Sequence, residues 1–500
     1  MEENSKITFA KNMNKLNFNT TLNIPVDTNA SIKTILDINS FIFDQKVECG
    51  NGKAIINGKI GTKVLYVDTD NLTNTLTFNT TFNETYIDSS VTSDTMLIVS
   101  SSSVSNNILS TDGSLKLNCD INLSLIAYIN LPISNNLELT NMTITKKSEL
   151  KTNTISQHIN TKFEHTTNFE IKDNINKILC NNCYFTCEKV AAQDGFMIVE
   201  GKMISNLLYE THQDENIIIK EIKEISPIKC DVEVANLTSE NILDLTFSID
   251  KYNQEVSTEV ADENNVVSIR QNINVYGVSL KPLSIDVVDD MFSTSNEIET
   301  TSSKREYTKQ AQHHSISEII SNEVSLRDDE TAIDEVLANL NIVPEITNTY
   351  IKDDNLMIEG IVVSNLTYID ENKEIKHKEI EIPYIINTKI SAEVLGCVHS
   401  DISLVDTRLK VKRGTIIEVE YTLFISLDIY EKETHEMIDS FKIGKQLDFS
   451  KYDFQIFIAK PNETIWELCK RIKISPDEIH QHNKNLPLIM EGGEKVIIKR

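Results

Sequence analysis

Three closely spaced cysteines are the residues in this chain best suited to chemistry. They are Cys180, Cys183 and Cys187, and a Cys-x-x-Cys pair can form half of a zinc site or a redox pair. A zinc site would need a fourth ligand, and Cys230 or His212 are the nearest candidates in the sequence. Whether the fold requires such a site depends on what occupies the equivalent positions elsewhere in the chain.

Other chemistry-bearing patterns are sparse. The chain has no Gly-x-Ser-x-Gly, no phosphate-binding loop motif, no His-Glu-x-x-His and no dinucleotide-binding glycine cluster. His313 and His314 are adjacent, but they lie in a polar stretch that we expect to be solvated. We therefore predict that the protein is not an enzyme and that it needs no metal or other cofactor.

The charge of the chain narrows the classes of partner. The formal net charge is −27, which argues against nucleic acid and against anionic membrane surfaces, because both require basic patches. No apolar run approaches the ~20 residues of a membrane-spanning helix, and the first residues lack the pattern of a signal peptide. The eight cysteines are scattered through 500 residues, as in reduced cytosolic proteins. We expect a cytoplasmic protein without a transmembrane segment.

An alternating segment that occurs three times predicts the elements that position these residues. It stands at 56–66, 199–209 and 358–368, and each copy contains a Gly and ends in a Tyr. The period of two predicts a strand, and eleven residues span about 36 Å, enough to cross a β-sandwich. The mid-strand Gly predicts a bulge or a close backbone approach. A Tyr placed identically in every copy predicts a residue that closes a core.

A second signature precedes each copy at a nearly constant distance. The segments 32–36, 175–179 and 333–337 begin 26, 26 and 27 residues before the Gly. Their apolar residues at i, i+3 and i+4 predict a short helical turn, preceded in the third copy by capping acidic residues at 328–330. In this alignment the three cysteines fall opposite non-cysteine residues in both other copies, so the fold does not require a metal there. These other residues are Asp37, Ser40, Asp44, Ala338, Asn341 and Glu345.

Further alternating runs, divided by Asn, Asp and Ser turns, follow each copy and complete the predicted fold class. We predict a mainly β protein of three repeated antiparallel β-sandwich-like modules, followed by a small C-terminal β-α-α-β domain. The modules span 20–150, 165–293 and 325–447. Residues 294–322 are rich in Ser, Thr, Glu and Gln, and we predict a linker there.

The C-terminal domain, at 452–500, changes character. A strand at 454–458 is followed by a helix at 461–471, with Ile465, Leu468 and Ile472 on one face. Ser475 is the predicted N-cap of a second helix, with Pro476 at its first position and Glu478 closing a capping box. A Gly pair then leads into a last strand at 495–499.

This last segment resembles the LysM family. The resemblance rests on 462–466, Leu468, 475–479, Asn483, Leu486, Gly492 and 496–498. Members of the family commonly bind glycans that contain N-acetylglucosamine, such as peptidoglycan, in a groove between two loops, here 460–465 and 485–492. The resemblance therefore implies a partner- or glycan-binding groove formed by Asn462, Glu463, Thr464, Ile465, Trp466, Leu486, Leu488, Ile489 and Met490.

Two features of this groove leave its ligand open. Asn462-Glu463 stands where the family has Gly-Asp, and residues 489–491 lengthen the second loop. Trp466 could be a binding platform or a core residue. Leu488, Ile489 and Met490 could form a protein-binding patch, or they could fold over the core of the domain itself.

The repeated modules resemble the SPOCS domain family of sporulating Firmicutes. The resemblance rests on 201–209, on the Ile-x-x-Ile-Leu lead-in and on the ending at 288–293. SPOCS modules that end in LysM imply a non-enzymatic adaptor of spore-envelope assembly in the mother-cell cytoplasm. It would bind the stage IV sporulation protein A ATPase through LysM and tether it at the forespore surface. The alternatives are a peptidoglycan or cortex glycan-binding protein and a hydrolase targeted by LysM.

Overall fold

The part of the chain that the structure describes is mainly β, as the sequence predicts, with several antiparallel sheets and two short helices. A computed structural model describes the chain except for residues 1–6, 13–15, 27–30, 90, 111–114, 134–142, 214–215, 262–263, 327–329, 354, 391–396, 449–453, 484 and 500. The acidic residues Asp328 and Asp329, predicted to cap a helix, lie outside the described residues. No helix among the described residues is long and apolar enough to cross a membrane.

Two facing sheets enclose the first core. The central sheet has the order β3-β4-β5, and the facing sheet has the order β1-β7-β2, with β6 also paired to β7. Alternate residues of β4 and β7 point between the sheets and form a common buried cluster. The strands are β1 (Ile7–Asn12), β2 (Leu16–Val26), β3 (Ile32–Gly50), β4 (Lys53–Asp68), β5 (Thr73–Ile87), β6 (Thr95–Ser110) and β7 (Leu115–Ile133).

The second sheet pair has the same plan. A central sheet of order β11-β10-β9 faces a sheet in which β14 pairs with β12, β13 and β8. Because β8 begins at Thr143 and pairs with β14, the predicted end of the first module at 150 and the start of the second at 165 are wrong. The strands are β8 (Thr143–Ile171), β9 (Ile175–Gln193), β10 (Phe196–Gln213), β11 (Asn216–Glu233), β12 (Ile242–Ile249), β13 (Glu255–Ala261) and β14 (Asn264–Ser293).

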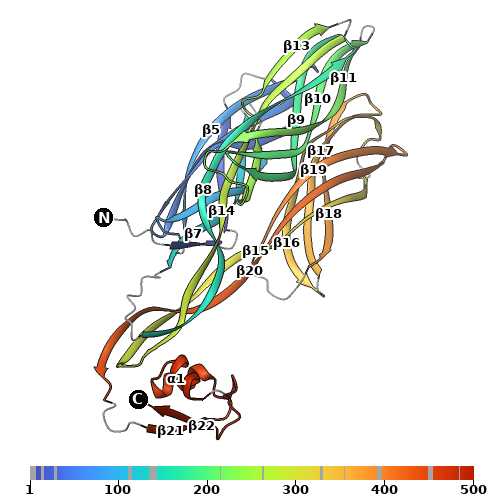
Figure 1. Cartoon of the computed structure of the whole chain (residues 1–500). Coiled ribbons are helices and arrows are strands. Elements are labelled where there is room, and N and C mark those ends of the chain that lie inside the picture. Colours follow the sequence, from blue (N-terminus) through green and yellow to red (C-terminus); the bar gives the residue numbers. More distant parts are fainter. Residues whose placement is uncertain are drawn as a thin grey trace.

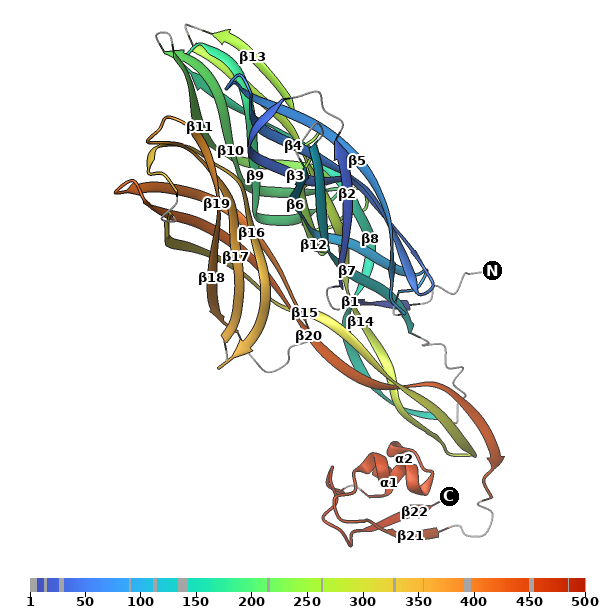
Figure 2. The same cartoon turned by 180° about the vertical axis from the view of Figure 1, so that it is seen from behind.

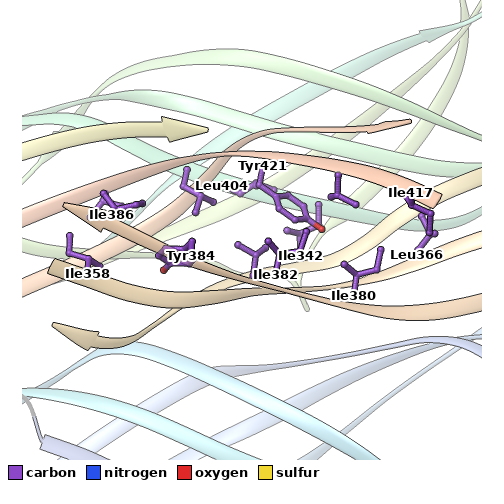
Figure 3. Close-up of a cluster of buried hydrophobic side chains, with 14 of the residues drawn as sticks. Ile342, Ile358, Leu366, Ile380, Ile382, Tyr384, Ile386, Leu404, Ile417 and Tyr421 are labelled. Atoms are coloured by element: carbon purple, nitrogen blue, oxygen red, sulfur yellow. The ribbon is translucent and has the colours of Figure 1, made fainter. Parts of the chain in front are cut away.

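The third sheet pair consists of β16-β17-β18 facing β15-β20-β19. Its core contains residues of all six strands in contact with one another, and Figure 3 shows Tyr421 lying among Ile and Leu side chains of both sheets. The Tyr421 hydroxyl lies 2.6 Å from Ser364 Oγ, so this buried polar group is satisfied. The strands are β15 (Asn296–Ser325), β16 (Ile333–Lys352), β17 (Asn355–Asp370), β18 (Ile375–Lys389), β19 (Cys397–Lys412) and β20 (Ile416–Gln446).

The lead-in segments that we predicted to be helical turns are strands with two bulges each. Register shifts flank Ile35 in β3, Ile178 in β9 and Val336 in β16, and the residue left out of the second shift is a leucine each time. A bulge inserts one unpaired residue, so it displaces the alternation by one position. With two bulges, the inward-facing apolar residues fall at positions i, i+3 and i+4, which is also the spacing of one face of a helix.

The three unpaired leucines meet. Leu36, Leu179 and Leu337 are buried in one cluster, so the three central sheets converge at their bulged strands. Polar contacts accompany this hub: Asn39 Nδ2 donates to Asn182 Oδ1 at 3.1 Å, and Asn365 Nδ2 donates to Asp37 Oδ1 at 2.6 Å. The three sheet pairs therefore form one body (Figure 2).

The mid-strand glycines lie at bulges, as predicted. Register shifts lie beside Gly58 in β4, Gly201 in β10 and Gly360 in β17. A Cβ at Gly201 would collide with the carbonyl oxygen of Thr186, and one at Gly360 with that of Glu345. The tyrosines Tyr66, Tyr209 and Tyr368 are buried in the three cores, as predicted for core-closing residues.

Four strands of about thirty residues extend from the body as a stalk, which Figure 1 shows narrowing toward the C-terminal end. The stalk consists of the ribbons β8–β14 and β15–β20, which pack through a small apolar cluster. The predicted linker at 294–322 is thus wrong, because β15 occupies it. Polar side chains suit a two-stranded ribbon that is open to water, and cross-strand pairs support it, such as Arg305–Asp439 at 2.5 Å and Lys432–Glu306 at 2.9 Å.

A β-α-α-β unit ends the chain, in the predicted element order. It comprises β21 (Phe454–Ile458), α1 (Ile465–Ile472), α2 (Pro476–His482) and β22 (Lys495–Lys499). Thr464 and Ser475 are N-caps with complete capping boxes, and Pro476 begins α2 as predicted. The first helix starts at Ile465 rather than at 461, because Thr464 caps it. We call residues 454–499 the C-terminal unit.

Candidate binding site of the C-terminal unit

The two loops predicted to form a groove are joined by backbone hydrogen bonds. Met490 N donates to Glu463 O at 2.9 Å, Asn462 N donates to Met490 O at 2.8 Å, and Ile465 N donates to Leu488 O at 3.3 Å. This short ladder fixes the first loop against the second. The structure therefore brings the predicted site residues at 462–465 and 488–490 together.

Only part of this set is available to a ligand. Leu488 and Ile489 are 81% and 59% exposed, whereas Met490 and Ile465 are buried in the core of the unit. Leu486 packs against the same core. The sequence leaves open whether Leu488, Ile489 and Met490 form a binding patch or fold over the core. Met490 folds over the core, whereas Leu488 and Ile489 face water. The prediction that Ile465 lines the binding surface is wrong, because its side chain is buried.

Glu463 is held within the protein. Its carboxylate accepts two hydrogen bonds from Arg471, at 2.7 and 2.9 Å, and a third from Lys460 N at 2.9 Å. The bonds from Arg471 are the main reason that the pKa of Glu463 is lowered. A buried, paired carboxylate of this kind fixes the turn before α1. The exposed part of the two joined loops is then formed by Asn462 and the two apolar residues Leu488 and Ile489.

Trp466 faces the stalk rather than the groove. Its indole Nε1 donates to Asp290 Oδ2 at 2.8 Å, and its ring packs edge-on against Phe292 with centroids 5.2 Å apart. Lys470, one turn further along α1, donates to Asp290 Oδ1 at 2.6 Å. We call this contact of Trp466 and Lys470 with Asp290 and Phe292 the dock. The prediction that placed Trp466 at the binding site is wrong, whereas the alternative of a core residue fits, because Trp466 is partly buried against the core of the unit.

The ending of the second sheet pair supplies the stalk side of the dock. Residues 288–293 lie at the end of β14, with a register shift between Val288 and Asp290. The two acidic residues there have separate tasks. Asp289 accepts from Ser148 Oγ at 2.8 Å and lies 2.8 Å from Nε2 of His435 on β20, which joins the two ribbons. Asp290 joins the stalk to the C-terminal unit.

Electrostatics favour an ionised Asp290. Burial alone would raise its pKa, but the hydrogen bonds from Lys470 and Trp466 and the charge of Lys470 outweigh that effect, so the pKa is lowered. The carboxylate thus remains charged in the docked state. Burial lowers the pKa of Lys473, whose ammonium lies 6.0 Å from the Phe292 ring centroid.

The three cysteines do not form a site. Cys183 is buried in the second core, Cys180 packs at the hub, and Cys187 packs in a third cluster at the other end of the second pair. Burial raises the pKa of all three thiols, to about 12 for Cys187, which opposes a thiolate. Among the described residues, no group of three or more His, Cys, Asp or Glu is placed to hold a metal ion.

A cavity of about 550 Å³ lies where the three sheet pairs meet. Asp244, which lines it, accepts hydrogen bonds from Tyr128 of the first pair and from Tyr430 of the third, the latter at 2.6 Å. His399 Nδ1 lies 3.7 Å from the same carboxylate. The polar groups of this cavity therefore join the body together. His313, also in its wall, pairs with Asp428 at 2.9 Å.

Sequence reasoning missed Asp290, Phe292 and Lys470 as functional residues. The ending at 288–293 is a signal, because it is part of the resemblance to the SPOCS family, but nothing in its spacing indicates what it contacts. Comparisons with known proteins add no relative: no family model, no curated protein and no solved structure matches this chain.

Proposed function

We propose that this chain is a non-enzymatic adaptor of spore-envelope assembly. Its C-terminal unit, a LysM-like domain, binds the stage IV sporulation protein A ATPase. The three sheet pairs, SPOCS-like modules, hold that partner at the forespore surface from the mother-cell cytoplasm. The sequence resemblances to the LysM and SPOCS families support the identity of the partner. The exposed pair Leu488 and Ile489 supports the kind of contact.

The carrying observation is the exposed apolar pair on the two joined loops. Leu488 and Ile489 are more than half exposed and lie beside each other on a loop that is fixed by backbone hydrogen bonds. Fixed, exposed apolar side chains are typical of protein-binding surfaces, because partner binding removes them from water at little cost in chain entropy. Glu463, the acidic residue of the groove, is engaged by Arg471 and so does not offer its carboxylate to a sugar.

The stalk supports an adaptor. It separates the C-terminal unit from the body, while the dock keeps the unit in one orientation. Two binding surfaces on one rigid chain raise the effective concentration of one partner near the other. The body can thus bind at one place while the C-terminal unit presents the groove elsewhere.

Binding to the purified ATPase tests the proposal. We expect the full chain to bind it in biolayer interferometry, and the double variant Leu488→Asp/Ile489→Asp to bind at least tenfold more weakly. Ile385→Asp is the matched control, because Ile385 is 63% exposed on β18 of the body. Failure of the unaltered chain to bind, or an equal loss in the control, would overturn the proposal.

The glycan-binding alternative rests on one observation, the β-α-α-β order with a capped second helix, which is the pattern behind the resemblance to the LysM family. Co-sedimentation of the full chain with purified peptidoglycan tests it. Under the adaptor proposal the chain stays in the supernatant. A saturable pellet fraction that Asn462→Ala reduces would establish the glycan alternative instead.

A further inference from the structure

The C-terminal unit exposes a second apolar surface, on the outer face of its sheet. Phe454, Ile456 and Ile458 alternate along β21 and are 57%, 54% and 52% exposed. Ile497 of β22 pairs with Ile456 and is 39% exposed. Residues paired across an antiparallel ladder share a face, so these four side chains form one patch, which we call the outer face.

The opposite face of the same sheet is covered by the helices. Phe457, Val496 and Ile498 pack against the two helices in the core of the unit. Four of the five residues of β21 are apolar, and all three on its outer side are, although a sheet with one covered face normally has a polar outer side. The composition of β21 is that of a strand covered on both sides, and within the described chain only one side is covered.

The dock determines where the outer face points. Trp466 and Lys470 attach α1 to the stalk, and the helices lie between the stalk and the sheet in both views (Figures 1 and 2). The outer face is thus at the far end of the elongated molecule, turned away from the stalk. A partner can reach it without displacing any described part of the chain.

The charges around the outer face indicate what it fits. Lys495 is exposed and pairs with Ile458, so it stands at one end of the apolar row. Residues 452–500 carry eight Lys or Arg against seven Asp or Glu, whereas the whole chain carries 48 against 75. A lysine at the end of an apolar row complements a partner with a carboxylate beside its own apolar row.

Two other occupants fit less well. An anionic membrane surface would attract the lysines but would repel the strongly acidic remainder of the chain. A second copy of the outer face would bring another Lys495 to the interface rather than a carboxylate, so it offers no complementary charge.

We propose that the outer face, formed by Phe454, Ile456, Ile458 and Ile497, is a docking surface for a protein segment whose apolar row is flanked by carboxylates. It is separate from the exposed pair Leu488 and Ile489, so the C-terminal unit holds its partner by two surfaces. The inference rests on the proposed function for the identity of the partner, but not for its chemistry.

Synthetic peptides test the chemistry without the ATPase. Two peptides share a Leu-Thr-Phe-Thr-Leu core and differ only in their flanks, which are Glu-Glu in one and Lys-Lys in the other. We expect the Glu-flanked peptide to bind the full chain, by fluorescence anisotropy, at least tenfold more tightly than the Lys-flanked one. Ile456→Glu should weaken this binding at least tenfold, Lys495→Glu should reverse the preference, and Ile385→Glu should change neither.

The outcomes separate this inference from the proposed function. Equal binding of both peptides, or no effect of Ile456→Glu, overturns the docking surface even if the ATPase binds. Failure of the ATPase to bind, with the peptide results as expected, overturns only the proposed function. Flotation of the chain with phosphatidylglycerol vesicles, or self-association in sedimentation that Ile456→Glu abolishes, would assign the outer face to a membrane or to a second copy and overturn the proposal.

Discussion

Asp290 provides a direct way to detach the C-terminal unit. Asp290→Ala removes the acceptor of two hydrogen bonds, from Trp466 at 2.8 Å and from Lys470 at 2.6 Å. Hydrogen bonds that involve a charged group contribute about 1.5–3 kcal/mol each. The side chains of Lys470 and Asp290 are 44% and 28% exposed, so the Lys470 bond belongs at the level of a surface ion pair, about 0–1 kcal/mol. We therefore expect a total loss of about 2 kcal/mol, or roughly a 30-fold shift toward the undocked state.

Trp466 reports this shift without a label, because it is the only tryptophan in the chain. Undocking exposes the indole to water, so the emission maximum should move to longer wavelength and iodide quenching should increase. Phe292→Ala should act in the same direction, because it removes the aromatic contact. Asp231→Ala, on the exposed side of β11, is the control and should leave both signals unchanged.

The pH dependence of the same signal follows from the lowered pKa of Asp290. A depressed carboxyl pKa stabilises the docked state fully above the ordinary pKa near 3.8, and that stability disappears as the pH falls through the lowered value. Emission of the unaltered protein should thus be constant from pH 8 to about pH 5 and shift below about pH 4. Identical fluorescence of the unaltered protein and Asp290→Ala at neutral pH would refute the dock.

Two further predictions concern the body. Burial raises the pKa of Asp37 from 3.8 to about 6, so the folded state favours the protonated form, and stability falls as the pH rises from about 4 to 6. Asp37→Asn keeps an acceptor for Asn365, and it should raise the unfolding free energy by about 2–3 kcal/mol at pH 7.5 but little at pH 4. Urea denaturation at both pH values checks this prediction. An equal effect at both pH values would contradict it. Gly201→Ala should lower the unfolding free energy by about 1–3 kcal/mol, because its Cβ collides with the Thr186 carbonyl. The control is Gly50→Ala, whose nearest neighbours would be 3.9 Å away and which should melt within a degree or two of the unaltered protein. Equal melting of the two variants would show that the bulge tolerates a side chain.

Local patterns predicted the elements whose causes are local. The alternation at 199–209 gave the central strand β10, and Ser475, Pro476 and Glu478 gave the start of α2. Each of these depends on side chains within a few residues of one another. The mid-strand Gly also predicted its own bulge, because a missing Cβ is a local sign of a close backbone approach.

The lead-in segments show the limit of reading periodicity. Apolar residues at i, i+3 and i+4 fit one face of a helix, and they fit equally a strand with two bulges. What decides between them is the partner strand and the hub, where Leu179 meets Leu36 and Leu337. That information lies in residues more than a hundred positions away in the sequence.

The same reason explains the errors at 294–322 and at Trp466. A polar stretch forms a strand when a matching polar strand lies beside it, and β20 supplies that strand from about 100 to 150 residues downstream. The hydrogen bond from Trp466 to Asp290 spans 176 residues. No motif within the C-terminal unit could distinguish a side chain that faces a foreign ligand from one that faces the chain's own stalk.

The course of the chain through the stalk has a mechanical consequence. The backbone runs out to the tip along β14, returns along β15 and runs out again along β20 before it enters the C-terminal unit. Tension on that unit would pull β20 lengthwise past β15, and the dock would pull β14 lengthwise past β8. Both ladders would be loaded in shear, so many hydrogen bonds would share the force at once and the stalk should resist extension. The dock, which has few contacts, should break first.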